Sequence, residues 1–268
     1  MSAIQRILSD TSSGCPVIPG CYDRLSAALV EAEGFPAAVL SGASIQASFA
    51  GFSADPELAD FADMTRHVAA ATRLPLLVDG EDGFGSPAGA VCELLDAGAD
   101  AVHVEDYVPA RGGLVDPADF ARTIGEIGAA IAGRDGMLLV RTDGLRQSAD
   151  EAVDRAKRYA ERGDVGAILP YLGPLMGPDR KSELMAFLGR LVEAVPVPVV
   201  AYAPLGHELS AAECAEVGVR ALLVPHLVLG SAAAAARRAL DHVRDAEAAL
   251  RFTRDNDVWD LPRLRELL

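Results

Sequence analysis

Three carboxylate side chains lie where predicted strands end, beside a cluster of glycines. Asp79 and Glu81 belong to the stretch 79-DGEDGFG-85, and Glu105 follows the apolar run 101-AVHV-104. Hard oxygen donors of this kind suit Mg²⁺, which takes one or a few carboxylates and keeps waters and substrate oxygens as its other ligands. The three residues are therefore candidate magnesium ligands, with Mn²⁺ as the alternative ion. Loop caps and salt bridges are the structural roles that the same carboxylates could have instead.

An arginine and two groups that can carry a proton follow other predicted strands. Arg141 begins the sequence 141-RTD-143, and its planar guanidinium can bind both oxygens of a substrate carboxylate or pair with a carboxylate inside the barrel. Tyr202 and His226 end two later strands, and His226 is a candidate for proton transfer or carbonyl recognition. His103 is interpreted as a core histidine one layer below the metal.

The elements that must position these side chains alternate regularly along the chain. Short apolar runs are separated by stretches with apolar residues at three- and four-residue spacing, which indicate helices. Strict alternation predicts a parallel sheet covered by helices, and eight such units predict an α/β fold, a (β/α)8 TIM-type barrel with an extra C-terminal helical tail. An open doubly wound sheet is the alternative architecture. The expected strands are residues 16–21, 37–42, 74–79, 101–106, 137–143, 166–172, 197–202 and 221–226.

In a barrel of this kind the active site lies at the carboxyl ends of the strands. Tyr22 ends the first strand and is a candidate for substrate binding, while Ser41, Gly42 and Ala43 end the second. Side chains alternate between the two faces of a strand, so apolar residues should fill the lower barrel beneath a polar rim. The pairs expected on the inner face are Asp79 with Leu77, Glu105 with His103, Arg141 with Leu139, and His226 with Val224 and Leu222.

The length and composition are typical of a single domain. The chain has 268 residues and is 50% hydrophobic, so residues 1–268 are expected to form one barrel with a large core. The tail 251–268 is expected to pack either on its own barrel or on a neighbouring subunit. A net charge of −15 argues against nucleic-acid binding, which needs basic surface. Four cysteines without a CxxC pair, and no long apolar run, predict a reduced cytoplasmic protein without a membrane span.

The chain resembles the isocitrate lyase / phosphoenolpyruvate mutase superfamily over nearly its whole length. The resemblance implies a magnesium-dependent barrel enzyme that makes or breaks C–C or C–P bonds next to an oxalyl or pyruvyl unit, through an enolate-like intermediate. It also implies a homo-oligomer, a dimer or tetramer, since members commonly form tetramers with exchanged C-terminal helices. The stretches that carry the resemblance are 19-PGCYDRLSAALVEAEGF-35, 40-LSGAS-44, 76-LLVDGEDGFG-85, 97-AGADAVHVED-106 and 140-VRTDG-144.

Roles for individual residues follow from this resemblance. Asp79 would hold the metal, and Glu81 and Glu105 would bind its waters. Arg141 would bind the 2-oxo acid end of the substrate, and Asp55 matches an aspartate of a gating loop. Backbone and hydroxyl groups of Ser41, Gly42 and Ala43 would face the substrate carboxylate.

Several departures from the family pattern narrow the expected reaction. The loop 107-YVPARGGLVDP-117 lacks the cysteine and histidine that the isocitrate and methylisocitrate lyases carry there. Glu81 replaces the usual aspartate, and Tyr171 replaces a glutamate of the lyases. Tyr202 stands where the lyases have asparagine and, together with His226, resembles the oxaloacetate decarboxylase branch.

The interpretation that fits these departures is a Mg²⁺-dependent carbon–carbon lyase acting on a small 2-oxo dicarboxylate, with oxaloacetate as the first candidate substrate. A phosphonopyruvate hydrolase or mutase is the second hypothesis. A non-catalytic barrel that binds a 2-oxo acid is the third, and an unrelated barrel family with a similar acidic rim is the fourth.

Overall fold

The computed structural model describes residues 1–12, 14–49, 55–177, 179–203, 209–243 and 246–255. Eight parallel strands form one sheet in the order β8-β7-β4-β3-β2-β1-β10-β9. A single parallel bridge joins Ile168 to Val199 across the two outer strands, so the sheet is a nearly closed barrel and the open-sheet alternative is wrong. The strands are β1 Val17–Cys21, β2 Ala38–Leu40, β3 Leu76–Asp79, β4 Ala101–Glu105, β7 Met137–Thr142, β8 Ala167–Pro170, β9 Val200–Tyr202 and β10 Ala221–Val224.

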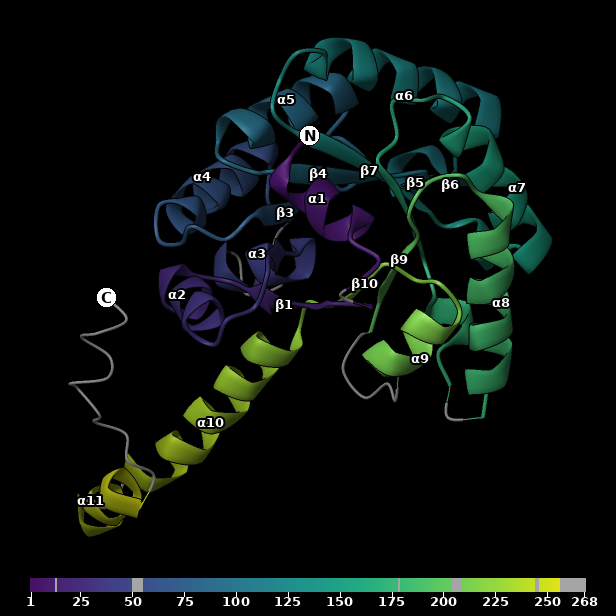
Figure 1. Ribbon diagram of the computed structural model, residues 1–268. Helices are drawn as coiled ribbons and strands as arrows, with labels where there is room; N and C mark the ends of the chain where they lie inside the picture. The colour runs from purple at the N-terminus through teal and green to yellow at the C-terminus, as the bar shows by residue number, and fades with distance from the viewer. Residues whose placement is uncertain (13, 50–54, 178, 204–208, 244–245, 256–268) are drawn as a thin grey trace.

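All eight strands fall within the runs expected from the sequence, and helices connect them around the outside of the barrel (Figure 1). A small antiparallel hairpin in the loop after β4 was not expected; it consists of β5 Tyr107–Val108 and β6 Gly113–Leu114 with the 3-10 helix η1 Pro109–Arg111 between them. The helices are α1 Ala3–Ser9, α2 Arg24–Ala32, α3 Gly42–Phe49, α4 Leu58–Ala69, α5 Pro87–Asp96, α6 Pro117–Ile131, η2 Gly144–Arg146, α7 Ala149–Ala160, η3 Gly173–Leu175, α8 Lys181–Ala194, α9 Ala211–Glu216, α10 Leu227–Val243 and α11 Ala246–Asp255.

Local sequence explains where the helices begin and end, and α7 is a clear case. The Ser148 hydroxyl accepts a hydrogen bond from the Glu151 N–H at the start of the helix, where an otherwise unpaired donor needs a partner. Acidic residues occupy its first turn and Lys157 and Arg158 its last turn, which complements the helix dipole.

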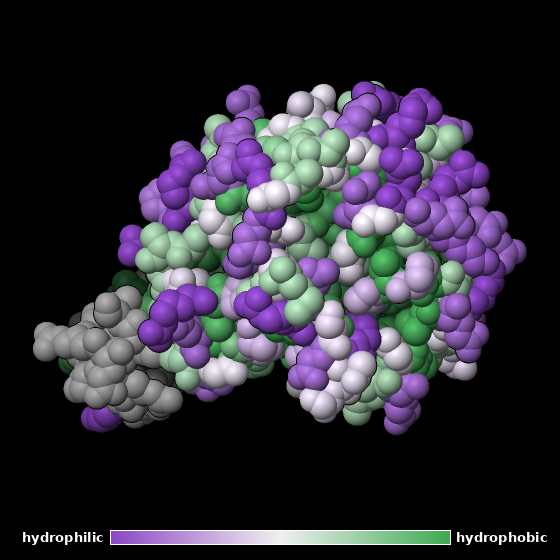
Figure 2. Space-filling view, turned by 45° about the horizontal axis from the view of Figure 1, so that its top comes forward, coloured by the Kyte–Doolittle hydropathy of each residue, from purple (hydrophilic) through white to green (hydrophobic). Residues whose placement is uncertain are grey.

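Hydrophilic side chains cover the right side of the molecule, over α7 and α8 (Figure 2). The charged faces of these helices are therefore outside, and their apolar faces lie against the barrel.

The barrel interior is filled with apolar side chains. Leu77, Leu139 and Leu223 belong to an inner cluster, which Ile4 and Leu8 of α1 extend at the amino-terminal end of the strands. This confirms the expected inner positions of Leu77 and Leu139 beneath Asp79 and Arg141. Because the lower barrel is packed with apolar side chains, the polar groups that follow in each strand are confined to its carboxyl end.

The expectation for the last strand is wrong. Leu222 packs in the outer cluster against the helices, and its neighbour Leu223 points inward. His226 lies in the turn between β10 and α10, so strand alternation does not decide its direction.

Helix α10 extends away from the barrel, and α11 follows at its far end (Figure 1). None of the residues of α10 is buried, and Leu240, Val243 and Leu250 are 64%, 65% and 71% exposed. Of the expected tail 251–268, residues 256–268 lie outside the described residues. Across the described residues, no helix has both the length and the apolar character to cross a membrane.

Candidate active site

A cavity of about 310 Å³ opens at the carboxyl ends of the barrel strands, where the sequence predicts the site. Seven of the candidate residues line it, and they come from five different strands or the turns that follow them. These residues are Ser41, Ala43, Asp79, Glu81, Arg141, Tyr202 and His226. Gln46 and His103 also contribute polar groups, and Val39, Leu169 and Leu223 form apolar parts of the wall.

Asp79 is held at the wall of this cavity by backbone donors. Its side chain accepts hydrogen bonds from the Gly42 N–H at 3.0 Å and from the Glu81 N–H at 3.0 Å. The residue is only 8% exposed. The carboxylate is therefore fixed in direction by the first turn of α3 and by its own loop, as a metal-binding group needs to be.

Glu81 directs its carboxylate to the same place. Its backbone is in the left-handed region, with φ of 47°, and its side chain lies beside Gly42, where an added Cβ would overlap Oε1 of Glu81 and lie 3.2 Å from Oδ2 of Asp79. The negative charge of Asp79, burial, and the charge of Glu105 raise the pKa of Glu81 to about 9. Such crowding of acids is relieved by a cation.

Glu105 lies near the charge of Asp79, but it also forms an ion pair with an arginine. Its Oε2 lies 2.5 Å from Nη1 of Arg141, and its side chain is 8% exposed. Burial, opposed by Arg141 and reinforced by the charge of Asp79, raises the pKa of Glu105 to about 8. The internal salt bridge that the sequence left open for Arg141 is thus present, on a side chain that also lines the cavity.

The donor set fits a hard divalent cation. Among the described residues, no three His, Cys, Asp or Glu side chains form a complete metal cage. Magnesium does not need one, since it commonly takes one or two carboxylates and keeps several waters. Asp79 and Glu81 converge beside Gly42 and offer oxygen ligands only, and the nearby charge of Asp79 raises the pKa of Glu81, so that a bound cation would favour its ionised form.

His103 lies closer to the chemistry than the sequence indicated. It lines the cavity, and its Nε2 is 3.5 Å from Oδ1 of Asp79. Burial lowers its pKa, so the ring is neutral near pH 7 and the contact is not an ion pair. Within the part of the chain that the structure describes, its Nδ1 has no hydrogen-bond partner. The position of His103 on the same face as Glu105 was the signal that could have placed it in the site.

Tyr202 and His226 line the wall of the same cavity. Burial raises the pKa of the Tyr202 phenol and lowers the pKa of His226. Near pH 7 the first is therefore a neutral hydroxyl and the second a neutral imidazole. Both can hydrogen-bond to a substrate without adding charge to the site.

Some of the other candidates line the cavity and some do not. The Ser41 hydroxyl donates to Oγ of Ser44 at 2.9 Å, and Ala43 is in the first turn of α3, whose N–H groups lack helical partners. Tyr22 is not among the residues that line the cavity. Asp55 is exposed and accepts a hydrogen bond from Nε2 of the cavity residue Gln46 at 3.5 Å.

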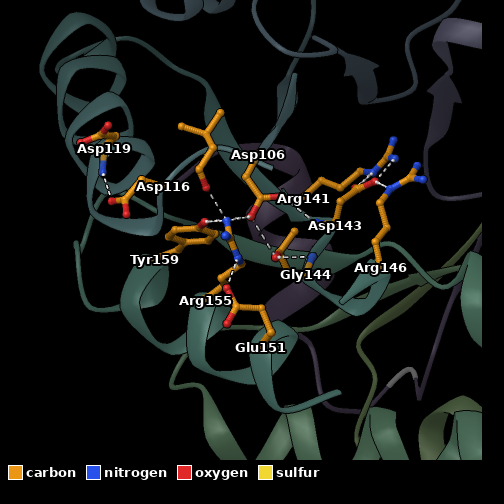
Figure 3. Close-up of polar contacts among 12 residues, drawn as sticks. Asp106, Asp116, Asp119, Arg141, Asp143, Gly144, Arg146, Glu151, Arg155 and Tyr159 are labelled. Carbon is orange, nitrogen blue, oxygen red and sulfur yellow. Dashed lines mark hydrogen bonds and ion pairs between the residues drawn. The ribbon is translucent and has the colours of Figure 1, made fainter. Parts of the chain in front are cut away.

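Behind Arg141 lies a buried network that the sequence did not reveal (Figure 3). Asp143 is fully buried and binds Nε and Nη2 of Arg141 at 2.8 and 3.2 Å. Its own N–H donates to Oδ1 of Asp106 at 2.7 Å. Asp106 also accepts from Arg155 at 3.1 Å and from the Tyr159 hydroxyl at 2.8 Å. Hydrogen bonds through these two buried aspartates thus connect α7 to Arg141.

A second arginine extends the network. Nε of Arg146 donates to Oδ2 of Asp143 at 2.7 Å. Its guanidinium lies 4.1 Å from the centroid of the Tyr107 ring and 4.2 Å from that of Tyr171, while Arg141 is 5.1 Å from the Tyr171 centroid. The hairpin after β4 is therefore attached to the loops after β7 and β8 by this stack.

The chain is similar in sequence and in fold to known proteins. The sequence profile of the phosphoenolpyruvate phosphomutase family matches residues 7–244. A probable 2-methylisocitrate lyase from Corynebacterium glutamicum is 33% identical over 69% of this chain. The alignment spans 61% of that relative and about half of the length of several others. An oxaloacetate decarboxylase from Rhodopseudomonas palustris is 29% identical over 94% of this chain and 87% of its own.

Among solved structures, a phosphonopyruvate hydrolase in complex with oxalate and Mg²⁺ has a TM-score of 0.79 and 27% identity. The match covers 91% of this chain and 87% of the hydrolase. The likeness therefore extends over the whole barrel.

Proposed function

Because the chain belongs to the phosphoenolpyruvate phosphomutase family, we propose that it is a Mg²⁺-dependent carbon–carbon lyase of the isocitrate lyase/PEP mutase superfamily. Its substrate is a small 2-oxo dicarboxylate, and the first candidate is oxaloacetate, which would lose CO2 to give pyruvate. The observation that carries this proposal is that one cavity is lined by two acids, Asp79 and Glu81, together with Arg141 and Tyr202.

The cation would be held by Asp79, with Glu81 and Glu105 binding its waters. When bound, it supplies positive charge to the 2-oxo and carboxylate oxygens and so stabilises an enolate. Mn²⁺ offers the same oxygen preference and is the alternative ion.

The remaining steps belong to side chains of this protein. Arg141 orients the carboxylate end of the substrate, because Asp143 and Glu105 hold its guanidinium in place. Tyr202 keeps its proton near pH 7 and would donate it to the enolate carbon after CO2 has left. His226, in the wall of the same cavity, binds the substrate as a neutral hydrogen-bond partner.

The loop after β4 supports decarboxylation over cleavage of a tricarboxylate. It forms the β5–β6 hairpin and has neither cysteine nor histidine between residues 107 and 117. Decarboxylation of a 2-oxo acid with a β-carboxylate requires no nucleophile, only an electron sink and a proton donor. The relative named oxaloacetate decarboxylase, which is similar over nearly the whole chain, supports the same reaction.

A second candidate is hydrolysis of phosphonopyruvate, favoured by the likeness to the phosphonopyruvate hydrolase structure. Measuring pyruvate release from oxaloacetate and from phosphonopyruvate, each with Mg²⁺ and with a chelator, separates the two. We expect Mg²⁺-dependent release from oxaloacetate only. Release from phosphonopyruvate alone would replace the first proposal by the second, and turnover of neither would remove both and leave a non-catalytic binding protein.

We further propose that the protein is a homo-oligomer, a dimer or tetramer. Support comes from α10, which exposes Leu240 and Val243 and extends away from its own barrel (Figure 1). Light scattering on the purified chain tests this, and a monomer at micromolar concentration would contradict it. The cytoplasmic location stays a prediction.

A further inference from the structure

Arg146 has the features of an anion-binding group that is already in position. The two tyrosine rings of the stack lie 4.1 and 4.2 Å from its guanidinium carbon. Its Nε donates to the fully buried Asp143. Two aromatic rings and one carboxylate thus hold the guanidinium, which restricts its rotation before any ligand binds.

The remaining edge of this guanidinium is free. Within the described residues, Nη1 and Nη2 of Arg146 make no hydrogen bond, and the side chain is 36% exposed. A planar fork of two N–H groups matches a carboxylate, and contacts of this kind are stronger than those between neutral groups. The exposed edge therefore has the geometry of a carboxylate receptor.

Arg146 is connected to the cavity through two shared partners. Asp143 accepts hydrogen bonds from both Arg141 and Arg146, and Tyr171 stacks with both. The charge of Arg146 also acts on the phenol of Tyr202, a cavity residue. The two arginines are thus neighbours, with Arg141 in the wall of the cavity and Arg146 beside it.

We propose that Arg146 binds the distal carboxylate of the substrate, the one farther from the 2-oxo group. The inference rests on the proposed function, because it assumes that the 2-oxo acid end lies between Asp79 and Arg141. It makes Arg146 a specificity residue: acids with a second carboxylate bind, and acids with a methyl group there bind weakly.

This assignment has a kinetic consequence for a decarboxylase. A guanidinium on the β-carboxylate stabilises the bound substrate, but the carboxylate loses its charge when CO2 leaves. The contact is therefore weaker in the transition state than in the ground state. Removing it should raise KM for oxaloacetate while kcat stays unchanged or increases.

Equilibrium binding with Mg²⁺ tests the proposal without turnover. The matched probes are malate and 2-hydroxybutyrate, which differ by a carboxylate in place of a methyl group, and oxalate reports on the 2-oxo acid end. For Arg146→Met we expect malate to bind roughly 10- to 100-fold more weakly, the range for losing a charged hydrogen bond. Oxalate and 2-hydroxybutyrate should change less than about twofold, a range consistent with unaltered contacts.

Two further variants complete the design. Arg146→Lys keeps the charge but not the fork and should recover part of the malate affinity. Arg111→Met removes the same charge from the exposed tip of the hairpin and should leave all three affinities as they are. Oxalate binding by the Arg146→Met variant also shows that it is folded.

The outcomes distinguish this inference from the function on which it rests. If the wild-type protein binds oxalate with Mg²⁺ but Arg146→Met binds malate as tightly as wild type does, the subsite is refuted and the proposed function stands. If the wild-type protein does not bind oxalate in a Mg²⁺-dependent way, the proposed function fails first. A loss of malate affinity equal in Arg111→Met and Arg146→Met would reduce the effect to overall charge and refute the subsite too.

Discussion

Nη1 of Arg141 lies 2.5 Å from Oε2 of Glu105, and the two residues pair on neighbouring strands. The sequence predicted that Glu105 serves the metal and that Arg141 binds the substrate. The contact joins the proposed metal side of the cavity to its proposed substrate side. A change in charge on one side therefore acts directly on the other.

Asp79→Asn should reduce activity by at least about 100-fold, because the carboxylate that would hold the cation becomes a neutral amide. The change keeps the shape of the side chain, so the fold should persist. Steady-state assays over a range of Mg²⁺ concentrations, with circular dichroism to verify folding, give the measurement. Activity within a few-fold of wild type would remove Asp79 from the metal site.

Cys21→Ser is the matched negative control at a strand end. Cys21 is fully buried, its Sγ is 3.8 Å from the carbonyl oxygen of Val39, and burial raises the pKa of its thiol to about 12. The thiol is therefore unreactive near pH 7, and kcat/KM should stay within about twofold, as for a buried residue without a role in the transition state. Inactivation of the wild-type protein by a thiol reagent that modifies Cys21 would contradict this prediction.

Gly42→Ala should weaken metal binding without changing any ligand. Its Cβ would overlap Oε1 of Glu81 and so displace that carboxylate from Asp79. Titration calorimetry with Mg²⁺ or Mn²⁺ measures the loss. Gly189→Ala in α8 serves as the control, since its Cβ would meet Val217 at an ordinary 3.8 Å; equal affinity in both variants would contradict the assignment of Glu81.

The stability of the metal-free protein should fall as the pH rises. The pKa of Glu105 is raised to about 8 and that of Glu81 to about 9, from 4.5. In this pH range the folded state therefore binds more protons than the unfolded state, and the free energy of unfolding decreases between pH 4.5 and about 9. Thermal melts in chelator should show this decrease, Glu81→Gln should reduce it, and Mg²⁺ should raise Tm more at pH 8.5 than at pH 6. A metal-free Tm that rises over this interval would be the opposite result.

Arg155→Met should destabilise the fold by about 3–5 kcal/mol, because it leaves the buried carboxylate of Asp106 without its cation. Arg155 contacts Asp106 at 3.1 Å with a side chain that is 5% exposed. Denaturant unfolding gives the free energy directly. Arg158→Met, on the exposed face of the same helix, should change it by no more than about 0.5 kcal/mol, and similar losses in both variants would deny the network its structural role.

The barrel and one part of the site could be predicted from local pattern alone. Alternation of apolar runs with helical stretches indicated all eight strands, because hydrophobic period depends only on neighbours in the chain. Asp79, Arg141 and Tyr202 could be placed at the cavity for the same reason: each ends a strand, and parallel strands of a barrel end at one rim. His226 lies at the rim as well, but in a turn where alternation gives no guidance.

What the chain by itself determined is therefore the set of groups at the mouth of the barrel. Only the tertiary structure decided which of them meet: Glu105 with Arg141, Glu81 with the space beside Gly42, and Arg146 with two tyrosines from distant loops. The reason is physical. The pairing of side chains across strands depends on sheet register, barrel closure and the paths of the loops, which arise from contacts between residues far apart in the sequence, and those contacts leave no periodic signal in it.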